Sequence, residues 1–267
     1  MRVVSLVPSL TETFLEMADA SQGGLLRLQL CGRTTFCIHP KERLPHVPVM
    51  GGTKTPKLEA ILRAEPDLVL LDEEENPRAI YDQLLMAGIP VVVSRITAAT
   101  QVPNLYRSLG ERLGLPAEAE ALAAQTESAL AATRRSDKDS ITVAPLIWHK
   151  PLMGLAEERY GGSLLAHVGF RVAAFESSNG YPTLSYESLG HAHLDALLLS
   201  SEPHDFTQEE GTAIANAVED LCGRRPLTVK IDGEMLTWFG TRTAAALHYF
   251  HALRASLLLA MPPRRRD

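Results

Sequence analysis

The stretch LEAILRAEPDLVLLDEE, residues 58–74, aligns without gaps on YESLGHAHLDALLLSSE, residues 186–202. The identical pairs are Glu59/Glu187, Ala64/Ala192, Asp67/Asp195, Leu70/Leu198, Leu71/Leu199 and Glu74/Glu202. Each copy has the pattern of a short helix, a turn that ends at the aspartate, a buried strand and an acidic loop. A proline-led strand follows each copy, which favours a duplicated lobe over the general similarity of βα units.

Short apolar runs extend this pattern along the chain. The predicted strands are residues 2–7, 47–50, 68–71, 91–94, 142–147, 196–199 and 228–231. Strands that alternate with helices predict an α/β fold with parallel sheets. Residues 116–136 are rich in alanine, glutamate and leucine, which predicts a helix from Ala117 to Arg135 of about 28 Å. We expect this helix to be a rigid strut between two Rossmann-like lobes.

The expected organisation has four parts. They are an N-terminal α/β lobe at 1–101, a linking segment with the long helix at 102–139, a C-terminal α/β lobe at 140–258 and a basic tail at 259–267. Ligands of open parallel sheets sit beyond the carboxyl ends of the strands. We therefore expect a ligand in a largely preformed cleft between the lobes.

Composition excludes several classes of protein. With 267 residues, of which 45% are hydrophobic and 22% charged, the chain is typical of folded globular proteins. A net charge of −6 argues against a nucleic acid partner, and no apolar run is long enough for membrane insertion. Three cysteines cannot form a disulfide framework, and the first residues read as a strand and turn, not an export signal. A cytoplasmic location is expected, or a periplasmic one if a leader has been removed.

The stretch TTFCIHP, residues 34–40, is the first candidate for a site. In an extended loop the side chains of Cys37 and His39 point the same way and could ligate a metal, line a pocket or fill a turn. Two ligands alone do not make a zinc site. Cys37 lacks the surroundings of a nucleophile, so we expect it to line a pocket, with metal ligation by Cys37 or His39 as an open alternative.

Aromatic and cationic residues gather in the loops that follow the predicted strands. Indole and phenol rings there suit a large planar or macrocyclic ligand, although packing between lobes is the alternative. The glycines would let a ligand approach the backbone, or form a plain tight turn. The candidate ligand-binding residues are Arg33, Phe36, Cys37, His39, Gly51, Gly52, Lys54, Trp148, Lys150, Tyr181 and Trp238.

The acidic loops after the two repeated strands end at Glu74 and Glu202. Their carboxylates could dock on arginines of a partner, take part in acid and base chemistry, bind a divalent metal, or simply be solvated.

Three stretches carry a family resemblance: RVVSLVPSLTETFLEMA (2–18), GGTKTPKLEAILRAEPDLVLLDEEEN (51–76) and YPTLSYESLGHAHLDALLLSSEP (181–203). They resemble the class III substrate-binding proteins of bacterial ABC importers, of the helical-backbone metal receptor superfamily, from residue 2 to about residue 254. The stretches GRTTFCIHP, IWHKPLM and DGEMLTWFGTR more narrowly resemble a subgroup of these proteins that begins directly at the first strand. The resemblance implies the class III periplasmic-binding-protein fold, a corrinoid, haem or ferric chelate as ligand, and Glu74 and Glu202 as docking points for an ABC permease.

We therefore expect non-enzymatic binding of a large metal chelate, with cobalamin or another corrinoid first, for transport, capture or sensing. No resident cofactor is expected beyond a bound corrinoid, haem or ferric chelate. The alternative is an enzyme in the same cleft, a metal-dependent hydrolase or corrinoid-modifying activity that uses His39, His149 and Glu74 or Glu75. A third class is an interaction module whose acidic loops bind a basic partner. Such a module would have a cleft poor in aromatic residues.

Overall fold

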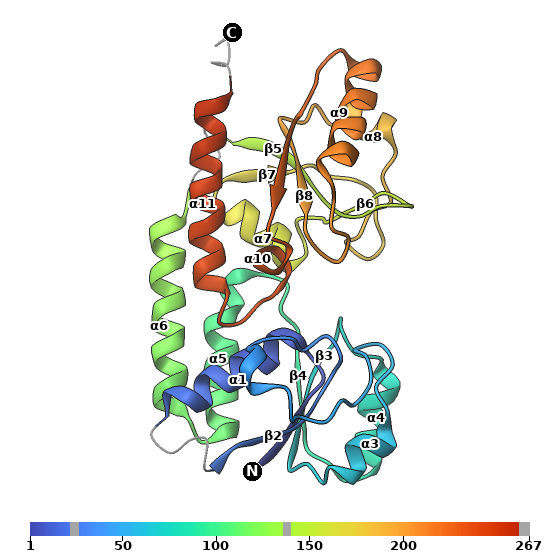
Figure 1. Ribbon diagram of the computed structural model, residues 1–267. Coiled ribbons are helices and arrows are strands. Elements are labelled where there is room, and N and C mark those ends of the chain that lie inside the picture. The colour runs from blue at the N-terminus through green and yellow to red at the C-terminus, as the bar shows by residue number, and fades with distance from the viewer. Residues whose placement is uncertain (22–26, 136–139, 262–267) are drawn as a thin grey trace. The chain divides into compact units, whose positions relative to one another are not determined.

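The computed structural model describes residues 1–21, 27–135 and 140–261, and the chain divides into two compact units (Figure 1). Within the described residues, unit 1 takes Met1–Ile96, Gln101–Thr126 and Trp238–Thr241. Unit 2 takes Thr97–Thr100, Glu127–Thr237 and the chain from Arg242 onward. Of the basic tail predicted at 259–267, residues 262–267 lie outside the described residues.

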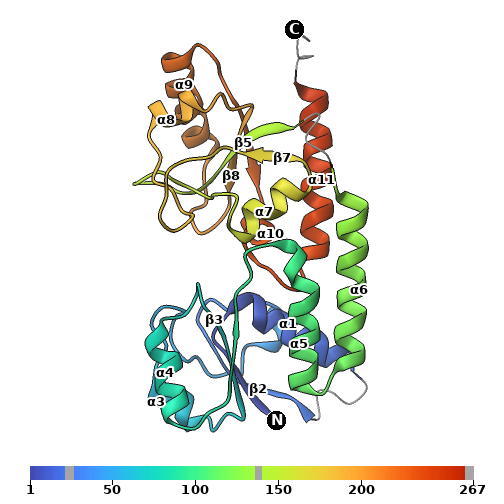
Figure 2. The ribbon, with the colours of Figure 1, turned by 180° about the vertical axis from the view of Figure 1, so that it is seen from behind.

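Unit 1 is built on a four-stranded parallel sheet of order β2-β1-β3-β4. Its strands are β1 (Arg2–Ser5), β2 (Gln29–Arg33), β3 (Leu68–Asp72) and β4 (Val91–Ser94). Its helices are α1 (Pro8–Ala20), η1 (Lys41–Arg43), α3 (Leu58–Arg63), α4 (Arg78–Met86) and α5 (Val102–Leu113). Every residue of β3 is buried, because α3 and α4 cover one face of the sheet and α1 and α5 the other (Figures 1 and 2).

Unit 2 has a five-stranded sheet of order β6-β5-β8-β9, with β7 also paired to β5. Its strands are β5 (Ile141–Trp148), β6 (Met153–Gly154), β7 (Phe170–Val172), β8 (Ala196–Ser200) and β9 (Leu227–Ile231). Its helical segments are η2 (Ala99–Gln101), α7 (Tyr160–His167), α8 (Tyr186–His191), α9 (Gln208–Cys222), α10 (Gly233–Thr237) and α11 (Thr243–Ala260). All pairings are parallel except that of β6 with β5.

The two copies of the sequence repeat have the same local structure. The bounds of α8 and β8 are those of α3 and β3 moved by 128 positions. Asp67 Oδ2 accepts a hydrogen bond from the backbone N–H of Arg2 at 2.6 Å, and Asp195 Oδ2 accepts one from the N–H of Thr142 at 2.8 Å. In each unit the aspartate thus ties the turn before the repeated strand to the start of the first strand, which supports a duplicated lobe.

The predicted α/β fold with parallel sheets and two lobes is confirmed. The strand predicted at 47–50 is wrong, because this segment makes only an isolated bridge between Val49 and Arg33 while β2 takes the place beside β1. The predictions also missed β2, β6 and β7. These strands lie at sheet edges, two of them have only two or three residues, and neither length nor alternation marks them in the sequence.

The predicted long helix is confirmed as α6 (Pro116–Thr133). Pro116 opens it, where proline costs no hydrogen bond, and the division between the units falls inside it, after Thr126. The buried positions Ala119, Ala123 and Thr126 follow helical spacing. None of the helices formed by the described residues has the length and apolar character needed to cross a membrane.

Candidate functional site

Cys37 lies in the loop after β2 and is fully buried. Thr11 Oγ1 donates to its sulfur at 3.0 Å, and the hydroxyl of Thr34 lies 3.2 Å from the same atom. Burial raises the pKa of the Cys37 thiol, so the thiol stays protonated near neutral pH. These contacts favour a role inside the loop over contact with a ligand.

Arg33 holds the same loop through hydrogen bonds to its backbone. Its Nη1 donates to the backbone oxygens of Thr34 and Cys37, both at 3.1 Å, and its Nε donates to that of Leu44 at 3.4 Å. The guanidinium therefore organises the loop backbone.

Phe36 is the more exposed of the two exposed apolar side chains of this loop, at 58% against 43% for Ile38. A Cβ on Gly52 would lie 3.4 Å from Phe36 Cε2. Gly51 has a φ of +103°, and a Cβ there would lie 2.4 Å from the backbone oxygen of Thr55. Gly51 is thus required by the tight turn, whereas at Gly52 the nearest neighbour of an added Cβ would be Thr55 Oγ1 at 3.1 Å, and its distance to Phe36 is an ordinary contact.

Trp238 packs inside unit 1, although it follows most of unit 2 in the chain. Its ring stands edge-on to His39 with 5.6 Å between centroids, and 9% of its surface is exposed. Trp238 therefore contributes to packing within unit 1, beside His39.

Hydrogen bonds from Lys54 and to Asp72 hold the backbone of the acidic loop after β3. Lys54 Nζ donates to the backbone oxygen of Glu74, and Asp72 Oδ1 accepts from the N–H groups of Glu74 and Glu75. Burial, and then the charge of Asp72, raises the pKa of the Glu75 carboxyl. The side chain of Glu74 stays exposed.

In unit 2, Trp148 ends β5 and is 41% exposed. Lys150 follows it with a φ of +66° and is exposed. Tyr181 is half-buried, and the guanidinium of Arg159 lies 5.1 Å from the centre of its ring. Trp148 is thus the large ring at the carboxyl end of a unit 2 strand that a ligand could reach.

Glu202 follows β8 at the position equivalent to Glu74, but its side chain is held against α10. Thr237 Oγ1 donates to Glu202 Oε1 at 3.0 Å. A Cβ on Gly233 would lie 2.4 Å from Glu202 Cγ, so glycine permits this contact. The two proposed docking glutamates therefore differ in exposure.

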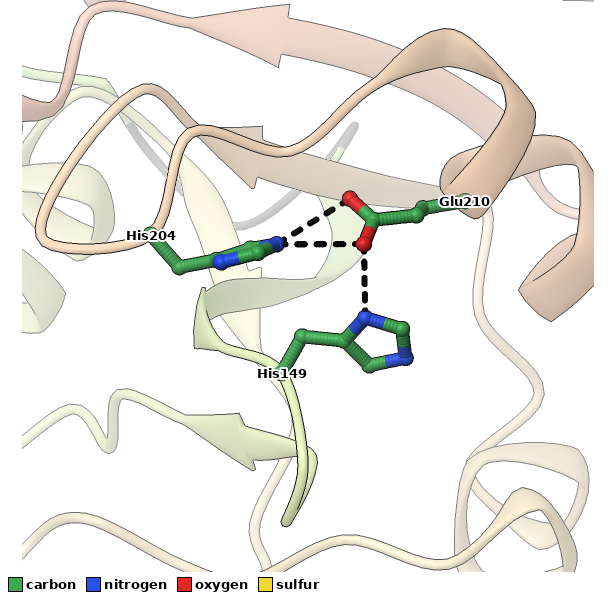
Figure 3. Close-up of side chains that lie close together, drawn as sticks. All are labelled: His149, His204 and Glu210. Atoms are coloured by element: carbon green, nitrogen blue, oxygen red, sulfur yellow. Dashed lines mark hydrogen bonds and ion pairs between the residues drawn. The ribbon is translucent and has the colours of Figure 1, made fainter.

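Three side chains of types that bind metals, His149, His204 and Glu210, lie close together in unit 2 (Figure 3). His149 Nδ1 lies 2.8 Å from Glu210 Oε1, and His204 Nε2 lies 3.0 Å from Glu210 Oε2. Thr207 N donates to Glu210 Oε2 at 3.0 Å, since Glu210 is the third residue of α9 and closes a capping box with Thr207. The hydrogen bonds from Thr207, His204 and His149, in that order, lower the pKa of the Glu210 carboxyl to about 2.

The sequence-based predictions missed His204 and Glu210, and named His149 only for the enzyme alternative. The sequence does contain a signal for Glu210. Thr207 followed three residues later by Glu210 is the pattern of a capping box, which marks the start of a helix and holds the carboxylate in place. In the described part of the chain, the cluster able to hold a metal is His149, His204 and Glu210, and it includes neither Cys37 nor His39. Metal ligation by those two residues stays a prediction.

Comparison with known proteins shows the family of this chain. The sequence model of the periplasmic binding protein family matches residues 3–218. The vitamin B12-binding protein of Pectobacterium carotovorum subsp. carotovorum (strain PC1) is 26% identical over 208 residues, 76% of this chain and 72% of that protein.

Solved structures share the fold at low sequence identity. The periplasmic vitamin B12 binding protein BtuF of Vibrio cholerae matches with a TM-score of 0.76 at 17% identity, over 96% of this chain and 97% of that one. The periplasmic heme-binding protein RhuT from Roseiflexus sp. RS-1, in apo form, matches with a TM-score of 0.75 at 24% identity, over 97% and 98%. The resemblance to class III substrate-binding proteins is confirmed, and the chain belongs to the periplasmic binding protein family.

Proposed function

We propose that the chain is a substrate-binding protein of an ABC importer and binds a large metal chelate. A corrinoid is the first candidate ligand, and a haem or a ferric chelate is the second. The observation that carries the proposal is the exposure of a large ring at the carboxyl end of a strand in each unit, Phe36 after β2 and Trp148 at the end of β5. Ligands of parallel sheets bind at this end, and exposed rings supply area for a macrocycle.

The chemistry of the loops bears on the choice between a corrinoid and a haem. Proteins hold haem iron through a side-chain ligand such as histidine, cysteine or tyrosine. Among the candidate ligand-binding residues, Cys37 is buried and hydrogen-bonded to threonines and the guanidinium of Arg159 lies over the ring of Tyr181, so the half-buried His39 is the residue left for this role. A corrinoid that keeps its own axial ligands needs only ring contacts, and a relative named as a vitamin B12-binding protein supports this choice.

Transport further needs a permease, for which Glu74 and Glu202 are the proposed contacts. Support comes from their equivalent positions after β3 and β8 and from the exposed carboxylate of Glu74. Two carboxylates in equivalent positions suit arginines on a permease with two similar halves.

The location of the chain in the cell stays a prediction. Fractionation of the source cells, followed by detection of the chain with an antibody, tests it.

The test is a titration of the purified protein with cyanocobalamin, dicyanocobinamide, haemin and ferrichrome, in the presence of EDTA. Binding is followed by tryptophan fluorescence and visible absorption. We expect saturable quenching with the two corrinoids, and an affinity about tenfold weaker in Trp148→Ala, which corresponds to about 1.4 kcal/mol. Tyr186→Ala is the matched control, because Tyr186 is equally exposed at 42% but lies at the start of α8.

The pattern of responses decides among the chelates. A response to haemin or ferrichrome alone would overturn the corrinoid assignment and keep the chelate class. No saturable response to any of the four compounds by the folded protein would overturn the proposed function.

A further inference from the structure

We infer that unit 2 carries a binding site for a divalent transition metal ion, formed by His149, His204 and Glu210. The nitrogen of each imidazole that faces Glu210 and an oxygen of the carboxylate all lie within 4.8 Å of one another. The site lies within one unit and uses none of the residues proposed to bind the chelate. The inference does not rest on the proposed function, although Trp148, which is proposed to bind the chelate, packs on His204.

The spacing of the ligand atoms suits a tetrahedral ion. Zinc bonds to nitrogen and oxygen of about 2.0–2.1 Å put neighbouring ligand atoms about 3.4 Å apart. His149 Nδ1 and His204 Nε2 lie 2.8 Å and 3.3 Å from Glu210 Oε1. Small rotations of the side chains would open these contacts enough to admit the ion, which would replace the hydrogen bonds.

The neighbours of the cluster orient its side chains. The N–H of Thr207 fixes one carboxylate oxygen of Glu210 from the capping box. The fully buried ring of Phe206 stands edge-on to His204, with 4.7 Å between centroids, and Trp148 packs on His204 at 6.2 Å. Such outer contacts hold metal-binding imidazoles in place and restrict solvent around the ion.

The donor set selects the class of metal. Two imidazoles and one carboxylate suit Zn²⁺ and other borderline first-row ions, whereas Ca²⁺ and Mg²⁺ require oxygen ligands. The side chains of His149, His204 and Glu210 are 17%, 29% and 26% exposed, so an ion could enter from solvent. Three protein ligands leave a fourth position for water or for a group of another molecule.

The test measures metal binding in the absence of any chelate ligand. The protein is stripped with EDTA, dialysed against Zn²⁺, passed over a desalting column and analysed for zinc. Titration with Co²⁺ reports the geometry through its visible absorption. We expect one equivalent of zinc and an intense four-coordinate cobalt band, and at least a tenfold loss of affinity in His149→Ala, His204→Ala and Glu210→Gln, because removal of an outer contact alone costs about 10–100-fold.

Matched variants separate metal binding from folding. Glu210→Gln keeps the capping box, in which glutamine replaces glutamate, and removes the charged ligand. Glu209→Gln, the exposed neighbour on α9, and His191→Ala, an exposed histidine of α8, should bind zinc like the wild type. If the stripped wild type takes up no zinc, or if folded Glu210→Gln binds it unchanged, the site is refuted.

Trp148 supplies a second readout close to the site. In a Trp238→Phe background it is the remaining tryptophan, and its ring contacts His204. We expect Co²⁺ to quench its fluorescence in a saturable way, Zn²⁺ to reverse the quenching, and Glu210→Gln to abolish it. Equal quenching in Glu210→Gln would overturn the assignment.

Discussion

At the scale of the residue, burial decides what the cysteines can do. Cys31 and Cys37 are buried and Cys222 is exposed. Desolvation raises the pKa of the Cys31 and Cys37 thiols, so both remain protonated at neutral pH and lie out of reach of reagents. The sequence left pocket lining and metal ligation by Cys37 open because the burial of a side chain cannot be read from it.

We expect Ellman's reagent to react rapidly with one thiol of the native protein and with three after denaturation in urea. The rapid reaction should disappear in Cys222→Ser and persist in Cys37→Ala. Fast labelling of native Cys222→Ser at neutral pH would contradict the structure around Cys37.

Glu75 gives a pH dependence with a definite sign. Its folded-state pKa is raised above the ordinary value of 4.5, mainly by burial, so the native state binds its proton more tightly than the unfolded state does. Its contribution to stability is complete below pH 4.5 and is lost as pH rises through the folded pKa. Urea unfolding should therefore show Glu75→Gln to be more stable than wild type at pH 7, with the difference shrinking at pH 4. Glu73→Gln, an exposed neighbour in the same loop, is the control, and an equal difference at both pH values would refute the assignment.

At the scale of the element, contact between helices depends on single atoms. A Cβ on Gly110 of α5 would lie 2.3 Å from the Cβ of Ala119 on α6 and 2.8 Å from the backbone oxygen of Leu115. In α8, a Cβ on Gly190 would meet its nearest neighbour, Cys222, at 3.6 Å, an ordinary contact. Two helical glycines that look alike in sequence thus have different roles.

Gly110→Ala should destabilise the protein by about 1–3 kcal/mol, because α5 and α6 must move apart. Gly190→Ala should stabilise it by about 0.5–1 kcal/mol, because alanine favours the helix. Urea denaturation followed by circular dichroism measures both. Equal effects of the two changes would show that helix propensity, and not the contact with Ala119, controls these positions.

At the scale of the whole molecule, the chain leaves unit 1, forms most of unit 2 and returns to unit 1 at Trp238–Thr241. The return is held by local contacts, since Trp238 packs on His39 and the N–H of Thr241 donates to Thr13 Oγ1 at 3.3 Å. Trp148 ends strand β5 and Trp238 follows helix α10, both elements of unit 2, yet Trp148 belongs to unit 2 and Trp238 to unit 1.

Trp238→Ala should lower the free energy of unfolding by about 3–5 kcal/mol, as expected for a buried tryptophan. Trp148→Ala should lower it clearly less, because 41% of the side chain is exposed and its expected role is in binding. Thermal and urea unfolding of the two variants check this. A stability loss of similar size in both would place Trp148 in the core.

The sequence by itself determined the α/β class, the repeated unit of 128-residue offset, the long helix and the family, because local periodicity and motif order carry these features. The apolar pattern of β5 also marked the strand end at Trp148, whereas no such pattern marks β2, the strand before Phe36. Only the tertiary structure decided that Cys37 is enclosed by threonines, that Trp238 packs in unit 1, and that His149 meets His204 and Glu210. The physical reason is that burial, and contact between residues far apart in the chain such as His149 and Glu210, which are 61 positions apart, depend on how strands pair and loops close, which no local pattern encodes.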